Sequence, residues 1–177
     1  MPKEKKIIFL DRDGVLNALI ERDGKMVSPR LFQDFRFLEG VGNAIQVLCQ
    51  RKYVVVVVTN QPDISRGLML QTELDRMTRA VLALGVQQVL VCPHSDEDAC
   101  LCRKPKPGLL TQYLESLDCK PTDIWMIGDR EVDIEAGGLV GAKLIRVDSH
   151  PDQTTNANFR CSSLVEAVCV IVDIGEK

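Results

Sequence analysis

Residues 6–14 read KIIFLDRDG and residues 53–61 read YVVVVVTNQ. In each stretch a short apolar run passes directly into polar side chains. The second run contains five consecutive valines, and an unbroken run of β-branched residues is typical of a strand buried on both faces. We therefore expect two buried strands, over residues 6–10 and 54–58, that both end in polar residues.

Strand-like and helix-like segments alternate along the rest of the chain. Apolar residues at helical spacing or in short runs predict helices over 41–50, 71–84, 108–117, 131–139 and 164–172, and strands over 88–91, 124–127 and 143–147. This alternation indicates an α/β fold, a Rossmann-like three-layer sandwich with a central parallel sheet.

The composition narrows the class of protein. The chain has 177 residues, with 22 Lys and Arg against 25 Asp and Glu, a formal net charge of −3. This length, with 45% apolar residues, is typical of one globular domain over residues 1–177. The slight acidity argues against nucleic-acid binding, and the apolar runs are too short for a membrane span or a signal peptide. We expect a cytoplasmic monomer without nucleic-acid or membrane partners.

Two carboxylates follow the first strand, at the edge where parallel sheets bind their ligands. In an extended segment Asp11 and Asp13 point to the same side, so they need a cation or a shared proton. Oxygen ligands of this kind suit Mg²⁺. The alternative is a solvated turn, since Asp and Gly are common there. Taken alone, the motif leaves the two interpretations evenly balanced.

Two other predicted strands also end in polar residues. Thr59, Asn60 and Gln61 are neutral groups that can donate hydrogen bonds to an oxyanion, or cap the next helix. Asp129 is a third carboxylate at a strand end, and Asp133 follows at i+4, where it is either part of the site or an acid in the first turn of a helix. Such a concentration at one sheet edge favours a functional site.

Four segments, taken together, resemble the motifs of the haloacid dehalogenase superfamily of phosphatases. They are residues 9–17 (FLDRDGVLN), 58–61 (VTNQ), 102–105 (CRKP) and 127–130 (IGDR), in the family's order. The match extends from about residue 7 to residue 147 and contains no large insertion. The resemblance therefore implies a fold without a large cap domain. Residues 17–36 are then either a substrate-recognition loop or a surface flap.

The resemblance also implies a mechanism. Asp11 is the expected nucleophile and Asp13 the expected general acid and base, so the reaction passes through an aspartyl phosphate. Mg²⁺ is expected on Asp11, Asp13 and Asp129. Phosphoryl transfer depends on positioning and charge neutralisation, which these groups supply. The residues expected to bind substrate are Thr59, Asn60, Gln61, Arg103, Lys104 and Arg130.

A cysteine and histidine cluster lies within residues 92–107. Cys92, His94, Cys100 and Cys102 form the pattern C-x-H-x₅-C-x-C, a closed tetrahedral set of the kind that Zn²⁺ prefers. Because no position remains open, the zinc is expected to be structural and to aim Arg103 and the adjacent lysine at the phosphate. The alternatives are four unconnected residues and a solvated arginine.

The zinc loop resembles that of two enzyme groups, the D-glycero-D-manno-heptose 1,7-bisphosphate phosphatases and the histidinol-phosphatases. Residues 59–67, TNQPDISRG, are more similar to the heptose enzymes, although Pro62 and Asp63 depart from their Ser-Gly. We expect a phosphatase that removes the 7-phosphate of the heptose bisphosphate. Histidinol phosphate is the alternative substrate, and a non-catalytic zinc-stabilised binding module is a third interpretation.

Overall fold

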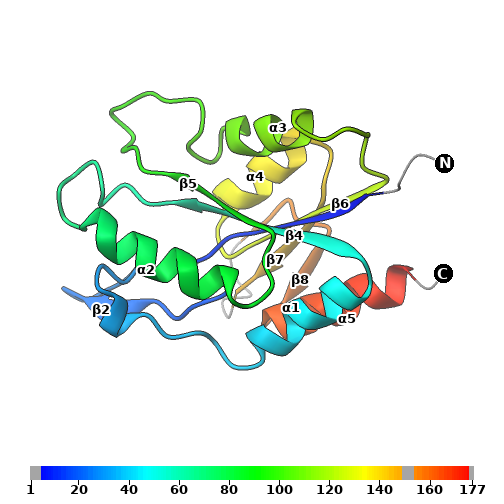
Figure 1. The fold of residues 1–177 in the computed structure, drawn as a ribbon, viewed down its shortest axis with the longest axis horizontal. Coiled ribbons are helices and arrows are strands. Elements are labelled where there is room, and N and C mark those ends of the chain that lie inside the picture. Colours follow the sequence, from blue (N-terminus) through cyan, green and yellow to red (C-terminus); the bar gives the residue numbers. More distant parts are fainter. Residues whose placement is uncertain (1–4, 149–153, 176–177) are drawn as a thin grey trace.

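The computed structural model describes residues 5–148 and 154–175. Its centre is a six-stranded sheet in the order β5-β4-β1-β6-β7-β8, and all neighbouring strands are parallel (Figure 1). The predicted α/β class with a central parallel sheet is confirmed. The strands are β1 (Lys6–Leu10), β4 (Tyr53–Asn60), β5 (Gln88–Cys92), β6 (Asp123–Gly128), β7 (Lys143–Val147) and β8 (Phe159–Cys161).

Helices cover both faces of the sheet and complete the three layers (Figure 1). One face carries α1 (Val41–Gln50), α2 (Gln71–Leu82) and α5 (Leu164–Gly175), and the other carries α3 (Gly108–Glu115) and α4 (Glu131–Leu139). None of the helices in the described part of the chain combines the length and apolar character that crossing a bilayer requires.

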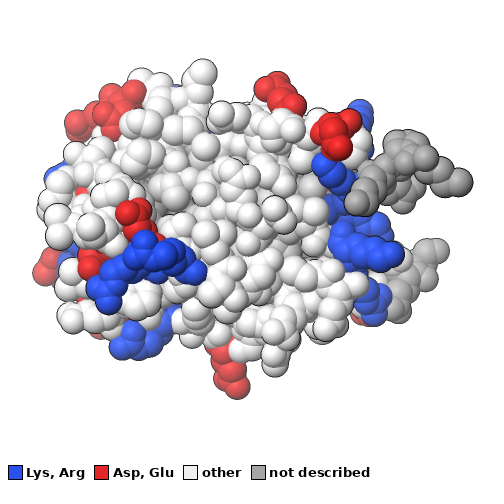
Figure 2. Space-filling view, in the orientation of Figure 1, with Lys and Arg blue, Asp and Glu red and all other residues white. Residues whose placement is uncertain are grey.

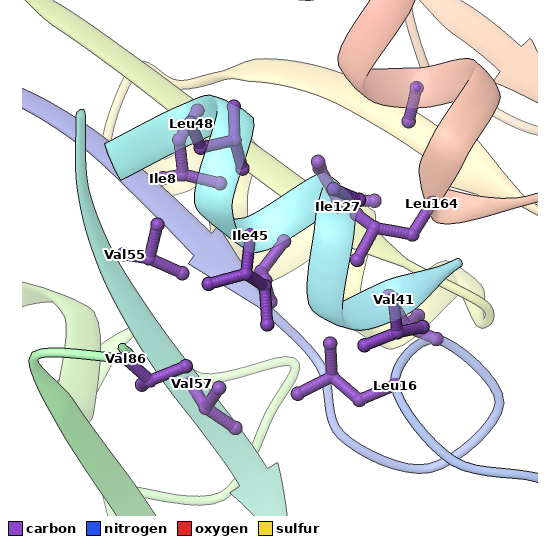
Figure 3. Close-up of a cluster of buried hydrophobic side chains, with 14 of the residues drawn as sticks. Ile8, Leu16, Val41, Ile45, Leu48, Val55, Val57, Val86, Ile127 and Leu164 are labelled. Carbon is purple, nitrogen blue, oxygen red and sulfur yellow. The ribbon is translucent and has the colours of Figure 1, made fainter. Parts of the chain in front are cut away.

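The two faces explain why the strands read as unbroken apolar runs. In β1, Ile8 packs with Ile45 and Leu48 of α1 on one face (Figure 3), while Ile7 and Phe9 pack against α3 and α4 on the other. Successive side chains of a strand alternate between faces, so a sheet that is covered on both sides needs apolar residues at every position.

Most element boundaries agree with the sequence analysis to within a few residues, but the short strands were missed. Residues 17–36 contain an antiparallel hairpin of β2 (Ile20–Arg22) and β3 (Lys25–Val27), followed by the 3₁₀ turn η1 (Phe32–Asp34). Three-residue strands are too short to show periodicity. The available signal was Asp23-Gly24, whose positive φ angles of 53° and 72° belong to a tight hairpin turn.

The chain order places a crevice at one edge of the sheet. From β1 the chain continues to β4 and β5 on one side, and then returns to β6, β7 and β8 on the other. Such a reversal leaves an opening at the carboxyl ends of the central strands, where α/β proteins bind ligands. Within the described residues, only the hairpin and the neighbouring loops stand over this opening, and no large cap domain is present.

Candidate active site

Three carboxylates and one ammonium group meet at the carboxyl ends of β1 and β6. Asp11 follows β1, Asp129 follows β6 and Asp133 lies in the first turn of α4, and one oxygen of each lies within 4.8 Å of the others. Lys104 Nζ donates hydrogen bonds to Asp11 Oδ1 and to the carbonyl oxygen of Val58, both at 2.6 Å, and lies 2.5 Å from Asp133 Oδ1. One buried cation thus faces three acids.

This imbalance shifts the pKa values of the acids. Burial, together with the charges of Asp133 and Asp13, raises the pKa of Asp11 to about 6, although Lys104 opposes the shift. Burial and the charges of Asp11 and Asp133 raise the pKa of Asp129 to about 8. Asp129 Oδ1 is buried and accepts no hydrogen bond from any described residue. The cluster therefore has excess negative charge and a carboxylate oxygen without a hydrogen bond, and a bound cation would compensate for both.

Asp133 is the member of this cluster that the sequence analysis left undecided. Both interpretations hold, because its two oxygens differ: Oδ2 accepts the backbone N–H of Arg130 at 3.1 Å and caps α4, while Oδ1 faces Lys104. The i+4 spacing from Asp129 was the available signal. The helix α4 begins at Glu131, where the sequence analysis expected it, and Asp133 in its first turn is buried.

Two glycines permit these close approaches. A Cβ atom on Gly14 would lie 2.3 Å from Asp129 Oδ2, and Gly14 also has a φ of +84°. A Cβ atom on Gly128 would lie 2.2 Å from the Cβ of Asp133. Any larger residue at either position would displace a carboxylate of the cluster.

Asp13 belongs to a separate group of hydrogen bonds. Its carboxylate accepts from Arg12 Nη2 at 3.0 Å, from Asn17 Nδ2 at 2.9 Å and from Gln61 Nε2 at 2.7 Å. Burial raises the pKa of the Asp13 carboxyl, but these donors outweigh burial and hold the pKa below its usual value. The structure therefore places Asp13 beside the cluster as an ionised group that its neighbours orient.

The neutral residues after β4 bind protein groups. Gln61 Nε2 also donates to Thr59 Oγ1 at 2.8 Å. Asn60 exchanges two hydrogen bonds with the backbone of Lys104, at 3.0 and 3.1 Å. Thr59 and Gln61 lie beside Asp13, whereas Asn60 fixes the chain that carries the lysine.

The three carboxylates of Asp11, Asp129 and Asp133 fit a hard divalent cation. They offer oxygen ligands in one small space, and the buried Asp129 Oδ1 accepts no hydrogen bond among the described residues, with Arg130 Nε 3.8 Å away as its ion-pair partner. The carboxylate of Asp13 is not among these grouped oxygens, so its expected share in the ion stays a prediction. The structure adds Asp133 to the grouped acids.

The predicted sulfur and nitrogen ligands converge between β5 and α3. Cys102 Sγ lies 3.2 Å from Cys92 Sγ, 3.4 Å from Cys100 Sγ and 3.2 Å from His94 Nδ1, and the described cysteines form no disulfide. A tetrahedral Zn²⁺ with bonds of about 2.3 Å separates its sulfur ligands by roughly 3.7 Å. The arrangement is consistent with a zinc site.

Arg103 binds residues of its own loop. Its Nε donates to Asp96 Oδ1 at 2.6 Å and its Nη1 to the carbonyl oxygen of His94 at 3.3 Å, so it closes the cysteine loop on itself. Sequence reasoning expected this arginine at the substrate because of its place in the motif. The motif alone could not show that Asp96, an exposed acid in the same loop, is within reach of its guanidinium group.

A cavity of about 290 Å³ opens beside the carboxylates. Its lining includes Asp13, Gln61 and Asp129, together with residues of the hairpin and of the loop after β4. Four arginines line it: Arg22, Arg30, Arg66 and Arg130. A buried carboxylate, a buried ammonium group and an arginine-lined cavity beside them are the kinds of group that bind a phosphate ester.

Comparison with known proteins agrees with this chemistry. Residues 101–167 match the HAD-hydrolase-like family model. The chain is 34% identical over 152 residues to the D-glycero-beta-D-manno-heptose-1,7-bisphosphate 7-phosphatase of Haemophilus ducreyi, which covers 78% of this chain and 80% of that protein. It is 36% identical over 151 residues to the enzyme of that name from Haemophilus influenzae, covering 78% of each.

A solved structure matches nearly the whole chain. It is the crystal structure of D,D-heptose 1,7-bisphosphate phosphatase from B. bronchiseptica complexed with magnesium and phosphate. The TM-score is 0.77 at 28% identity, over 96% of this chain and 99% of that one. With the sheet, the carboxylates and the curated relatives in agreement, the chain belongs to the haloacid dehalogenase-like (HAD) phosphatases and is a phosphoric monoester hydrolase.

Proposed function

We propose that the chain is a Mg²⁺-dependent phosphatase that works through an aspartyl phosphate on Asp11. The Asp11 carboxylate attacks phosphorus in line with the leaving oxygen, and Lys104, which already touches Asp11, neutralises the phosphoryl oxygens. Asp11, Asp129 and Asp133 would hold the metal. When bound, Mg²⁺ would add positive charge at the phosphoryl group and favour the ionised form of Asp11.

Asp13 is proposed as the general acid and base. It lines the cavity next to Asp129, so its carboxyl can reach the leaving alcohol. Because Asp13 is ionised in the free protein, it must first take up a proton, and the negative charge of a bound phosphate ester would favour this uptake. The protonated carboxyl then gives this proton to the alcohol oxygen as the phosphorus–oxygen bond breaks. It then takes a proton from the water that hydrolyses the aspartyl phosphate.

We further propose that the substrate is a sugar bisphosphate, most specifically the 7-phosphate ester of D-glycero-D-manno-heptose 1,7-bisphosphate. The observation that carries this proposal is the cationic wall of the cavity, made of Arg22, Arg30, Arg66 and Arg130. A second phosphate is an anion that guanidinium groups bind well. The names of the relatives point to the same compound.

Histidinol phosphate, the alternative substrate, carries an amine where the bisphosphate carries an anion. Asp63 is the acid on the wall that could receive this amine. It is already paired with Arg30 at 2.6 Å and with Arg66 at 3.6 Å. The wall therefore offers positive charge, which favours the bisphosphate.

Steady-state kinetics with the two substrates test this choice. We expect a higher kcat/KM for the heptose bisphosphate, and a loss of that preference in Arg66→Gln. Activity on an aryl phosphate, which needs no wall contact, serves as the internal control. A higher kcat/KM for histidinol phosphate would contradict the substrate proposal. A protein inactive on all three esters would instead support the binding-module interpretation.

We propose that the cysteine cluster binds one structural Zn²⁺. Its four protein ligands, Cys92, His94, Cys100 and Cys102, leave no position for water or substrate. The loop ends at Lys104, so ordering it presents the ammonium group to Asp11. Elemental analysis of protein purified without chelator is expected to give one zinc per chain.

We also propose that the chain acts as a single domain, as a monomer and in the cytoplasm. A reducing compartment suits a cluster of free thiols that binds metal. Sedimentation of the purified protein tests the monomer.

A further inference from the structure

Arg12 is a fully buried charged side chain beside the active site, and neither the nucleophile nor the metal cluster uses it. It lies between Asp11 and Asp13 in sequence and is 0% exposed. Its Nη2 lies 3.0 Å from both carboxylate oxygens of Asp13, and its Nε lies 3.3 Å from Oδ1. The guanidinium group thus grips one carboxylate with two nitrogens.

The other contacts of Arg12 offset little of the free-energy cost of burying its charge. Its guanidinium carbon lies 5.6 Å from the ring centre of Phe35, which packs against Phe37. Nη1 is buried and donates no hydrogen bond to any described residue. Burying a guanidinium group costs several kcal/mol, and a single ion pair does not offset that cost reliably. An apolar side chain would fill the same space without this cost.

The hydrogen bonds of Asp13 show what the arginine adds. Asn17 donates only to Oδ1 and Gln61 donates only to Oδ2, so each neutral donor restrains one oxygen of the carboxylate. Arg12 contacts both oxygens, and the planar guanidinium group therefore sets the plane of the carboxylate. Phe35 supports the guanidinium group in turn.

We propose that Arg12 is a positioning residue that holds the Asp13 carboxyl in the orientation needed for proton transfer to the leaving group. This inference rests on the proposed role of Asp13 as general acid and base. It predicts that losing the arginine harms the reactions that need a proton donor and spares those that do not. A purely structural role would lower all activities alike.

The test compares Arg12→Met, Arg12→Lys and Asp13→Asn, each with p-nitrophenyl phosphate, whose leaving group needs no proton, and with an alkyl phosphate, whose leaving group does. We expect Arg12→Met to lower kcat for the alkyl ester by about 10- to 100-fold, as misplacement of a catalytic group does. The loss for the aryl ester should be several-fold smaller. Arg12→Lys should recover only part of the alkyl phosphatase activity, because a lysine ammonium group lacks the planar, two-nitrogen geometry that contacts both carboxylate oxygens.

The double variant Arg12→Met with Asp13→Asn supplies the decisive comparison. If Arg12 acts through Asp13, adding Arg12→Met to Asp13→Asn should lower kcat no further. If Arg12→Met does not fold, Arg12→Lys replaces it in both backgrounds. Arg146→Met is the matched control, since Arg146 is also a buried arginine paired with acids, Glu131 at 3.0 Å and Asp148 at 2.6 Å. It should change stability without changing the ratio of alkyl to aryl rates.

Two results would overturn the inference while leaving the proposed mechanism intact. One is an equal loss for alkyl and aryl esters in the Arg12 variants. The other is a full additional loss in the double variant. Failure of the underlying mechanism would give a different result. Asp13→Asn alone would then keep normal alkyl phosphatase activity, and Arg12 would have no general acid to position.

Discussion

The two ends of strand β6 carry the same residue type in opposite circumstances. Asp123, at the start of the strand, accepts hydrogen bonds from Tyr53 Oη at 3.0 Å, Trp125 Nε1 at 2.9 Å and Lys143 Nζ at 3.0 Å. Despite partial burial, these donors hold its pKa below the usual value. Asp129, just beyond the other end, has a pKa raised to about 8 and a buried oxygen that accepts no hydrogen bond among the described residues.

This difference separates structural charge from functional charge. Protein donors satisfy the acid at the start of β6, whereas the acid after its end faces two other acids, accepts no hydrogen bond at Oδ1 and has only a 3.8 Å ion pair with Arg130. Unsatisfied, mutually repelling carboxylates cost stability, and proteins concentrate them where they bind or react. On the face shown in Figure 2, charged side chains lie around the edge and leave the centre of that face uncharged.

The largest expected effect comes from removing the proposed nucleophile, Asp11. Asp11→Asn keeps the shape of the side chain but cannot attack phosphorus, so kcat should fall by roughly 10³-fold or more. The circular dichroism spectrum should stay unchanged, because the substitution removes an acid that the fold does not need. Asp123→Asn is the control, with normal kcat expected. Near-normal turnover by Asp11→Asn would contradict its role.

The second largest effect concerns the loop that supports the same end of the sheet. Cys100→Ala should lose zinc and lower kcat/KM by up to about 10²-fold, because Lys104 then loses its fixed position. The core of the sheet should remain folded. Cys169→Ala, an exposed cysteine of α5, is the matched control and should change neither metal content nor activity. Full activity in zinc-free Cys100→Ala protein would contradict the supporting role.

The sequence could predict these two effects because the residues concerned lie in short, local motifs at strand ends. It could also predict the class of fold, since each strand shows its burial directly as an apolar run. It could not show that Asp133 faces Lys104, because that contact joins α4 to the loop before α3, or that Arg103 folds back onto Asp96. Contacts between side chains depend on three-dimensional distances that residue spacing does not encode.

The third prediction compares how the acids at the two ends of β6 change the free energy of unfolding with pH in the metal-free protein. In the unfolded chain an Asp loses its proton near pH 3.9, but folded Asp129 keeps it until about pH 8. Between these values the unfolded state binds fewer protons, so this group lowers the free energy of unfolding as pH rises. Asp129→Asn should remove that loss and stabilise the metal-free protein at pH 8 by about 1 kcal/mol or more.

Asp123→Asn should do the reverse. Its folded pKa lies below the unfolded value, so its contribution is present above about pH 4 and is lost as pH falls through the folded pKa. At neutral pH the substitution should lower the free energy of unfolding by roughly 1–3 kcal/mol. Urea titrations of both variants in chelator, at pH 5 and pH 8, measure whether each substitution raises or lowers the free energy of unfolding. Destabilisation of the metal-free protein by Asp129→Asn at pH 8 would contradict the comparison.

The smallest effect tests how completely the start of β6 is satisfied. Tyr53→Phe removes one of the three donors to Asp123 and leaves Trp125 and Lys143 in place. A single hydrogen bond to a charged, half-buried acceptor contributes about 1 kcal/mol, so the free energy of unfolding should fall by that amount with kcat and KM unchanged. At the opposite edge of the sheet we expect a different result: removing a hydrogen-bond partner of Asp11 should alter turnover. A fall in kcat for Tyr53→Phe would show that the two ends of the sheet are coupled, and the distinction between a structural end and a functional end would then fail.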